Sequence, residues 1–159
     1  MSPRVPMDWS NPLHILASGF GSGLAPYAPG TFGTLAAIPI VLLAQLLPGW
    51  LYAALTFLMF VTGVFICGRV AHDWGVSDHP AIVWDEFVGL LVTMSVAPPG
   101  AIGLIAGFLL FRLFDIAKPW PICSVDRRVH GGFGIMLDDV VAAMYAGLIL
   151  YLGVRWWGG

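Results

Sequence analysis

The feature that most constrains this sequence is a series of five long apolar segments. They occupy residues 31–47, 50–71, 81–97, 100–114 and 140–157. A helix needs about 20 apolar residues to cross a bilayer, with a range of about 17 to 25. The second and fifth segments meet this requirement easily, and the first and third are marginal. The fourth is short, so we expect it to be tilted, buried among its neighbours or extended by polar ends.

The composition is that of an integral membrane protein. Of the 159 residues, 58% are hydrophobic and 10% are charged, whereas soluble domains carry about 25% charged residues. Isolated strands cannot satisfy their backbone groups in lipid, so the segments are expected to be helices. We therefore predict a single all-α domain over residues 1–159, a membrane bundle with about four to five apolar helices and polar cytoplasmic loops. The N-terminal stretch lacks the pattern of a cleaved signal peptide, and no basic run indicates a nucleic-acid partner.

The connections between the segments are of two kinds. "LPGW" (47–50) and "APPG" (97–100) are tight and uncharged, whereas residues 72–80 and 115–139 form long polar connections. In an up-and-down bundle, both tight turns lie on one face and both polar connections lie on the other with the N-terminal arm. Most cations fall on or beside this polar face: Arg4, Arg69, Arg112, Lys118, Arg127 and Arg128, with Arg155 opposite. The positive-inside rule then makes the polar face of this multi-pass bundle cytoplasmic.

Carboxylates gather at three expected helix ends on the polar face. Asp85 and Glu86 are expected to open the third apolar helix, Asp138 and Asp139 to open the fifth, and Asp115 to close the fourth. Acids in a first helical turn complement the dipole, so capping and interfacial solvation explain the two pairs. Asp115 lies at the unfavourable end and needs a cation. Five carboxylates at one interface would repel one another without a bound cation, and all-oxygen ligation suits Mg²⁺ or Mn²⁺.

Cations are interleaved with these acids. In "FRLFDIAKPWPI" (111–122), Arg112, Asp115 and Lys118 follow at a spacing of three, which places them on one stripe of a helix that Pro119 ends. Carboxylates that hold a hard metal beside cations that bind oxyanions are typical of phosphoryl chemistry. A local ion-pair network is the alternative for this stretch.

Two glycine-rich stretches accompany the charged residues. "GFGSGLAPYAPGTFGT" (19–34) includes Gly30 and Thr31, and its backbone N–H groups are able to cradle an anion. It lacks the phosphate-loop pattern, and an interfacial connector is the alternative. "HGGFGIMLDD" (130–139) joins His130 and Gly132 to the aspartate pair. His130 is a candidate acid, base or phosphate contact, or simply a surface histidine.

Four stretches, taken together and in order, carry a family resemblance. They are "NPLHILASGFGSGLAPYAPGTFGTLAAIP" (11–39), "SDHPAIVWDEFVG" (77–89), "FRLFDIAKPWPI" (111–122) and "VHGGFGIMLDDVVA" (129–142). The chain closely resembles the phosphatidylglycerophosphatase A family over nearly its whole length. The resemblance implies Mg²⁺-dependent hydrolysis of the phospholipid phosphatidylglycerophosphate to phosphatidylglycerol and phosphate at the bacterial inner membrane.

The acidic residues match the family's motif positions, and the chemistry of the side chains then gives a set of expected roles. The expected Mg²⁺ ligands are Asp85, Glu86, Asp115, Asp138 and Asp139. Expected catalytic residues are Asp85, Glu86, Asp139, Lys118 and His130. Expected substrate contacts are Gly30, Thr31, Arg112, Lys118 and Gly132. Two other classes stay open, a transporter or channel for a divalent cation and a metal-dependent phospholipid phosphotransferase. A transporter places its acids near the bilayer midplane, whereas these collect at one interface.

Overall fold

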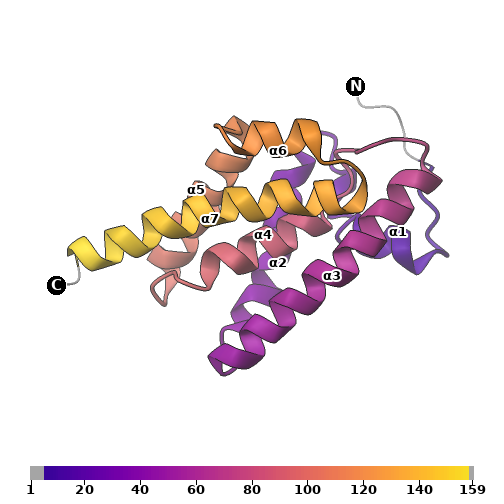
Figure 1. Ribbon diagram of the computed structural model, residues 1–159. Coiled ribbons are helices and arrows are strands. Elements are labelled where there is room, and N and C mark those ends of the chain that lie inside the picture. The colour runs from indigo at the N-terminus through magenta and orange to yellow at the C-terminus, as the bar shows by residue number, and fades with distance from the viewer. Residues whose placement is uncertain (1–5, 158–159) are drawn as a thin grey trace.

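A computed structural model describes residues 6–157, so Arg4 lies outside the described residues. Over this range the chain is all-helical, as predicted, and no strand is present. Its elements are α1 (Pro12–Ala17), the 3₁₀ turn η1 (Ser22–Leu24), α2 (Pro29–Ala44), α3 (Gly49–Asp73), α4 (Trp84–Met94), α5 (Ala101–Ala117), α6 (Ile122–Arg128) and α7 (Gly131–Trp157) (Figure 1).

Helix α4 forms the centre of the molecule. It packs against α2, α3, α5 and α7, and Phe87, Val88, Leu90 and Leu91 on it are fully buried. Nine of its eleven residues are buried, because neighbouring helices enclose it. The sequence predicted a marginal membrane span over residues 81–97. The helix has 11 residues, about 16 Å of length, so it is a core helix and too short to cross a bilayer.

Helix α7 is the longest element and crosses the whole molecule (Figure 1). It begins at Gly131, so the prediction that Asp138 and Asp139 open this helix is wrong, and both lie about two turns inside it. The expected polar connection over 115–139 is largely helical, because α6 and the first turns of α7 occupy it. Glycine in the first turn of α7 allows this end of the helix to pack closely against α3. A Cβ on Gly132 would collide with the carbonyl oxygen of Val64.

Two helices, α3 and α7, are long and apolar enough to cross a membrane. Helix α2 is apolar but shorter, and α5 is extended beyond its apolar segment to Ala117. The two long helices suggest membrane association, but a bundle of four to five crossings is not confirmed.

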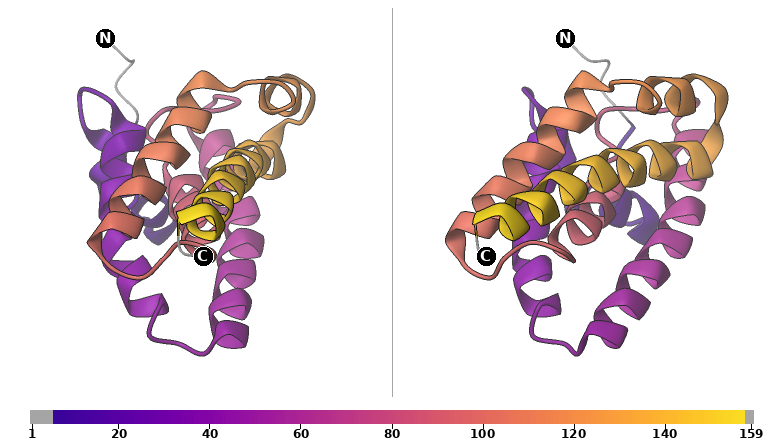
Figure 2. Two further views of the ribbon diagram at one scale, coloured as in Figure 1. Left: turned by 90° about the vertical axis from the view of Figure 1, so that its left-hand side faces the viewer. Right: turned by 60° about the vertical axis from the view of Figure 1, so that its left-hand side comes forward.

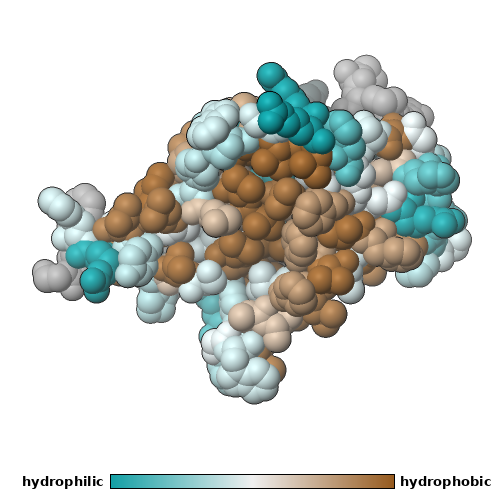
Figure 3. All heavy atoms as spheres, in the orientation of Figure 1, coloured by the Kyte–Doolittle hydropathy of each residue, from teal (hydrophilic) through white to brown (hydrophobic). Residues whose placement is uncertain are grey.

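The two ends of the molecule differ in polarity. Figure 2 shows the tight turns at 47–50 and 97–100 toward one end, and α6 with the loop between α3 and α4 at the other. Figure 3 shows brown apolar side chains across the middle of the molecule, with hydrophilic groups gathered above and to the right. The chain therefore separates an apolar body from a polar end, as the spacing of its loops predicted.

Candidate functional site

An acidic cavity of about 320 Å³ lies where α2, α4, α5 and α7 meet the loop before α4. All five carboxylates predicted from the sequence line it, together with both predicted cations. The charged lining residues are Asp78, Asp85, Glu86, Asp115, Asp138, Asp139, Arg112 and Lys118. Six carboxylates thus face two cations, and the cavity carries an excess of formal negative charge.

Arg112 joins two of the carboxylates. Its Nη1 atom lies 2.5 Å from Glu86 Oε2 and 2.6 Å from Asp115 Oδ2. The Thr34 hydroxyl lies 3.0 Å from the same Glu86 oxygen, which was not foreseen from the sequence. The guanidinium supplies the cation that Asp115 needs at the C-terminal end of α5. Glu86 and Asp115 are therefore held in position by ion pairs with the same guanidinium.

Lys118 holds the other side of the cavity. It caps α5 in a left-handed conformation, with φ of 39°, which turns its side chain away from the stripe that a continuous helix would give. Its Nζ lies 2.6 Å from Asp138 Oδ2 and 2.7 Å from Asp126 Oδ1. Partial burial opposes the charge on Lys118, but the hydrogen bonds to Asp126 and Asp138 outweigh it and raise the pKa of the ammonium.

Three of the six carboxylates, Asp78, Asp85 and Asp139, form no ion pair with a cation among the described residues. Asp85 Oδ1 accepts the backbone N–H of Glu86 at 3.1 Å. Both acids lie in the first turn of α4, as predicted, but no side chain caps its N-terminus. Asp139 is 3% exposed and its Oδ2 atom has no hydrogen-bond partner among residues 6–157. Asp138 Oδ1 is likewise buried without one. Burying such oxygens without a partner is unfavourable, and a bound cation would satisfy them.

The N-terminus of α2 forms the wall opposite α7. Gly30 and Thr31 line the cavity, as expected from the glycine-rich loop. A Cβ on Gly30 would meet Glu86 Oε1 and the guanidinium of Arg112, so glycine is required for this close approach. The N-terminus of this 16-residue helix places its positive dipole end at the cavity, which favours an anion.

His130 and Gly132 lie elsewhere. His130 lines a separate cavity of about 220 Å³ with Asp78, Asp126 and Asp138. Gly132 lies where α7 crosses α3. The structure brings neither of them into the acidic cavity with the other predicted residues.

His79 lines the acidic cavity but was not among the predicted site residues. Its Nδ1 accepts the backbone N–H of Ala81 at 3.1 Å, and its Nε2 is buried without a partner among the described residues. In a neutral imidazole this bond places the proton on Nε2. The sequence could have identified His79 as a candidate, because it lies in the same short stretch as Asp85 and Glu86.

The donors present suit a hard cation. Among residues 6–157, no three His, Cys, Asp or Glu side chains already form a metal-binding group. The donors that remain are carboxylate oxygens of Asp85, Asp138 and Asp139, two of them unsatisfied. All-oxygen donors of this kind fit Mg²⁺ better than zinc.

The fold and the cavity together define an all-helical protein with two candidate membrane helices and a polar, acid-rich site at one end of its apolar body. The family model for phosphatidylglycerophosphatase A matches residues 15–154. A protein of Escherichia coli named phosphatidylglycerophosphatase A is 50% identical over 152 residues, 94% of this chain and 88% of the relative. One of the same name from Haemophilus influenzae is 45% identical over 158 residues, 98% of this chain and 96% of the relative.

The chain therefore belongs to the phosphatidylglycerophosphatase A family. The resemblance read from the four sequence stretches is confirmed, and so is the expectation of a phosphatase at the level of the family. No solved structure matches the chain.

Proposed function

We propose that this protein hydrolyses the terminal phosphate monoester of phosphatidylglycerophosphate, giving phosphatidylglycerol and inorganic phosphate, with Mg²⁺ as cofactor. The observation that carries the proposal is the excess of carboxylates over cations in a cavity that also presents Arg112, Lys118 and the N-terminus of α2. Both names given to the Escherichia coli and Haemophilus influenzae relatives agree with this substrate.

Asp85 and Asp138 would hold the ion, with Asp139 beside them. When bound, Mg²⁺ supplies a Lewis acid that neutralises phosphoryl charge and lowers the pKa of water. Arg112, fixed by Glu86 and Asp115, would face the phosphoryl oxygens from one side and Lys118 from the other. The free Oδ2 of Asp139 is the best-placed acceptor for a proton from the attacking water. Glu86 is a weaker candidate because Arg112 already occupies its Oε2.

The polar end that carries this cavity would face the cytoplasm, in a multi-pass protein of the inner membrane. Its cations and loops support this orientation. The lipid would remain in the membrane while its headgroup entered the cavity. A divalent-cation transporter remains the second candidate class, and a phosphotransferase the third.

The test uses purified protein in detergent micelles with phosphatidylglycerophosphate, and phosphate release is measured. We expect release with Mg²⁺, loss on chelation and recovery when Mg²⁺ is restored. Asp85→Asn, Asp138→Asn and Asp139→Asn should each lower kcat/KM by about a hundredfold or more, equivalent to losing several kcal/mol of charge stabilisation. Asp73→Asn is the matched control, because Asp73 pairs with Arg69 on α3.

Near-normal turnover in most of the three variants would refute the carboxylate site. Phosphate that appears only on an added alcohol or nucleotide would identify a phosphotransferase. Wild-type protein that releases none but moves Mg²⁺ across a vesicle membrane would identify a transporter.

A further inference from the structure

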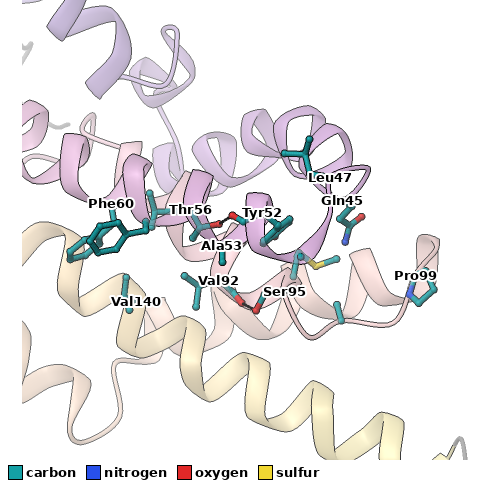
Figure 4. Close-up of a pocket in the computed structure, with 15 residues that line it drawn as sticks. Gln45, Leu47, Tyr52, Ala53, Thr56, Phe60, Val92, Ser95, Pro99 and Val140 are labelled. Carbon is teal, nitrogen blue, oxygen red and sulfur yellow. Dashed lines mark hydrogen bonds between the residues drawn. The ribbon is translucent and has the colours of Figure 1, made fainter.

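Two other cavities differ in how they relate to the acidic cavity. One, of about 720 Å³, has a mostly apolar lining (Figure 4) and shares no lining residue with the acidic cavity. Val88 lines it and Glu86 lines the acidic cavity, and residues two apart on a helix do not face the same side. The other is the cavity of about 220 Å³ beside His130, called here the His130 cavity, and it shares Asp78 and Asp138 with the acidic cavity. The polar site therefore extends toward α6 and not toward the apolar cavity.

Lys118 connects the two polar cavities. It lines the acidic cavity, and its Nζ lies 2.7 Å from Asp126 Oδ1 and 2.6 Å from Asp138 Oδ2. Asp138 lines both cavities, whereas Asp126 lines the His130 cavity and does not line the acidic one. An ammonium has three N–H donors. The two carboxylates therefore leave one donor of Lys118 for a ligand of the acidic cavity.

Helix α6 brings Asp126 to this position. Ile122 at the start of α6 is fully buried, and Asp126 follows it by four residues, so the two side chains lie on one face of the helix. Helix α6 packs against α7, which carries Asp138. The packing of α6 on α7 therefore places two carboxylates, one from each helix, around the same ammonium.

The second carboxylate matters because a lysine side chain is flexible. Lysine loses more rotamer freedom on being fixed than most side chains, and a single carboxylate leaves an ammonium free to turn about it. Asp138 is also a proposed ligand of Mg²⁺, and a cation bound there would repel the ammonium of Lys118. Asp126 lies outside the acidic cavity, so it is the partner of Lys118 that a ligand of that cavity does not share.

From the shared ammonium, the packing of α6 and the place of Asp126 outside the acidic cavity, we propose that Asp126 is a positioning residue. It holds Lys118 so that one N–H donor is available to the phosphoryl group in the acidic cavity. This proposal rests on the proposed function and deepens it, because it extends the site to α6.

The first test measures how firmly Lys118 is held, without turnover. Lys118 is the only lysine in the sequence, so the full chain labelled with ¹³C-lysine gives one Cε methylene signal in detergent micelles. Its order parameter should roughly halve in Asp126→Asn, as expected when a fixed group becomes flexible. It should stay near the wild-type value in Asp126→Glu, which keeps a carboxylate. Asp73→Asn is the control, because Asp73 pairs with Arg69 outside both polar cavities.

An order parameter that is equally high in Asp126→Asn, or already low in the wild type, would overturn the proposal. Asp126 is exposed, so asparagine is expected to leave the fold intact, and thermal unfolding of each variant in the same micelles checks this.

The second test asks whether Asp126 affects the reaction through Lys118. With Mg²⁺ and phosphatidylglycerophosphate, Asp126→Asn should lower kcat/KM about tenfold, the effect of weakening one hydrogen bond to a charged group. Asp126→Glu should recover most of this loss. In a Lys118→Gln background, Asp126→Asn should change kcat/KM less than about twofold, because the group through which it acts is already gone.

An equal loss in both backgrounds, or unchanged phosphate release by Asp126→Asn, would overturn the proposal. Wild-type protein that releases no phosphate would instead overturn the proposed function, and the order parameter would still decide whether Asp126 holds Lys118.

Discussion

Glu86 and Asp139 lie in the same cavity but have different partners. Glu86 accepts from Arg112 and lies beside Thr34, whereas Asp139 has a buried oxygen with no partner among the described residues. A fixed, paired carboxylate positions the groups around it, and an unpaired one is available to a cation or a proton. The two acids therefore differ in whether a neighbouring side chain hydrogen-bonds to their carboxylate oxygens.

The sequence could predict the members of this cavity but not their pairing. Arg112 and Asp115 pair at a spacing of three along α5, which is a local relation visible in the sequence. Lys118 bonds to Asp138, 20 residues away, only because its left-handed backbone turns it from the helix. Thr34 and His79 reach the cavity through the packing of α2 and of the loop before α4, which no spacing rule reports.

His79 is expected to act as a fixed hydrogen-bond donor to a phosphoryl oxygen. His79→Ala should lower kcat/KM about ten- to a hundredfold, since a hydrogen bond to a charged group contributes about 1.5 to 3 kcal/mol. His79→Gln should recover part of this loss because its amide retains a donor. Steady-state phosphate release measures both, and His72→Ala, with a side chain that is 85% exposed, is the control.

His130→Ala completes the comparison of the two histidines. A larger loss for His130→Ala than for His79→Ala would assign the catalytic role to His130, as the sequence predicted, and would contradict this role for His79.

At the scale of elements, the crossing of α7 over α3 places the last two carboxylates. Gly132 allows this crossing, because its Cα lies against the backbone of Val64 and Gly68. Asp138 and Asp139 follow about two turns further along the same rigid helix. The sequence pointed to Gly132 as a substrate contact. Its position indicates that it acts by setting the distance between two helices.

Gly132→Ala should therefore disturb both stability and activity. The added methyl group would force α7 away from α3, which we expect to cost about 1 to 3 kcal/mol of stability. The same shift would move Asp138 and Asp139 and lower phosphate release. Thermal unfolding in detergent and turnover measure the two effects.

Gly153→Ala on the same helix is the control for this substitution. A Cβ there meets nothing within 4 Å, so alanine should leave both measurements within error or raise the melting temperature slightly. A Gly132→Ala protein as stable and active as the wild type would contradict this prediction, because it would show that a methyl group fits between α7 and α3.

The apolar runs predicted the main helices well but not their roles. Long uninterrupted segments identified α3 and α7, because a continuous apolar run of this length rarely forms a structure other than a long helix. The run that contains α4 looked similar, yet the structure encloses it on all sides. Apolar composition reports that a helix avoids water, and it does not tell lipid from protein as the alternative surroundings. Helix α6 was missed because it has only seven residues, in which apolar and polar side chains are mixed, so it forms no apolar run.

At the scale of the whole molecule, the separation of tight turns from polar loops predicts an orientation. We expect Gly49→Cys, on the tight-turn end, to react with a membrane-impermeant maleimide on intact cells after the outer membrane is opened. Ser77→Cys, on the polar end, should react only after the inner membrane is permeabilised. Both positions are exposed. The background carries Cys67→Ala and Cys123→Ser, because these are the native cysteines.

Phosphate release by the cysteine-free background is the control for folding. Labelling of Ser77→Cys from outside, with Gly49→Cys protected, would reverse the proposed orientation. Labelling of both from one side would show that the chain does not place these two ends on opposite sides of the membrane.

The walls of the acidic cavity come from α2, α4, α5 and α7, in the order in which a ribosome makes them. A nascent chain that has reached Lys118 already contains both cavity cations but lacks Asp138 and Asp139. The cavity then has four carboxylates against two cations, and the final helix raises this to six against two and adds the buried oxygens of Asp138 and Asp139 that have no partner among the described residues. The protein would therefore be inert toward its lipid throughout its own insertion, and its activity would report that synthesis had reached the final helix.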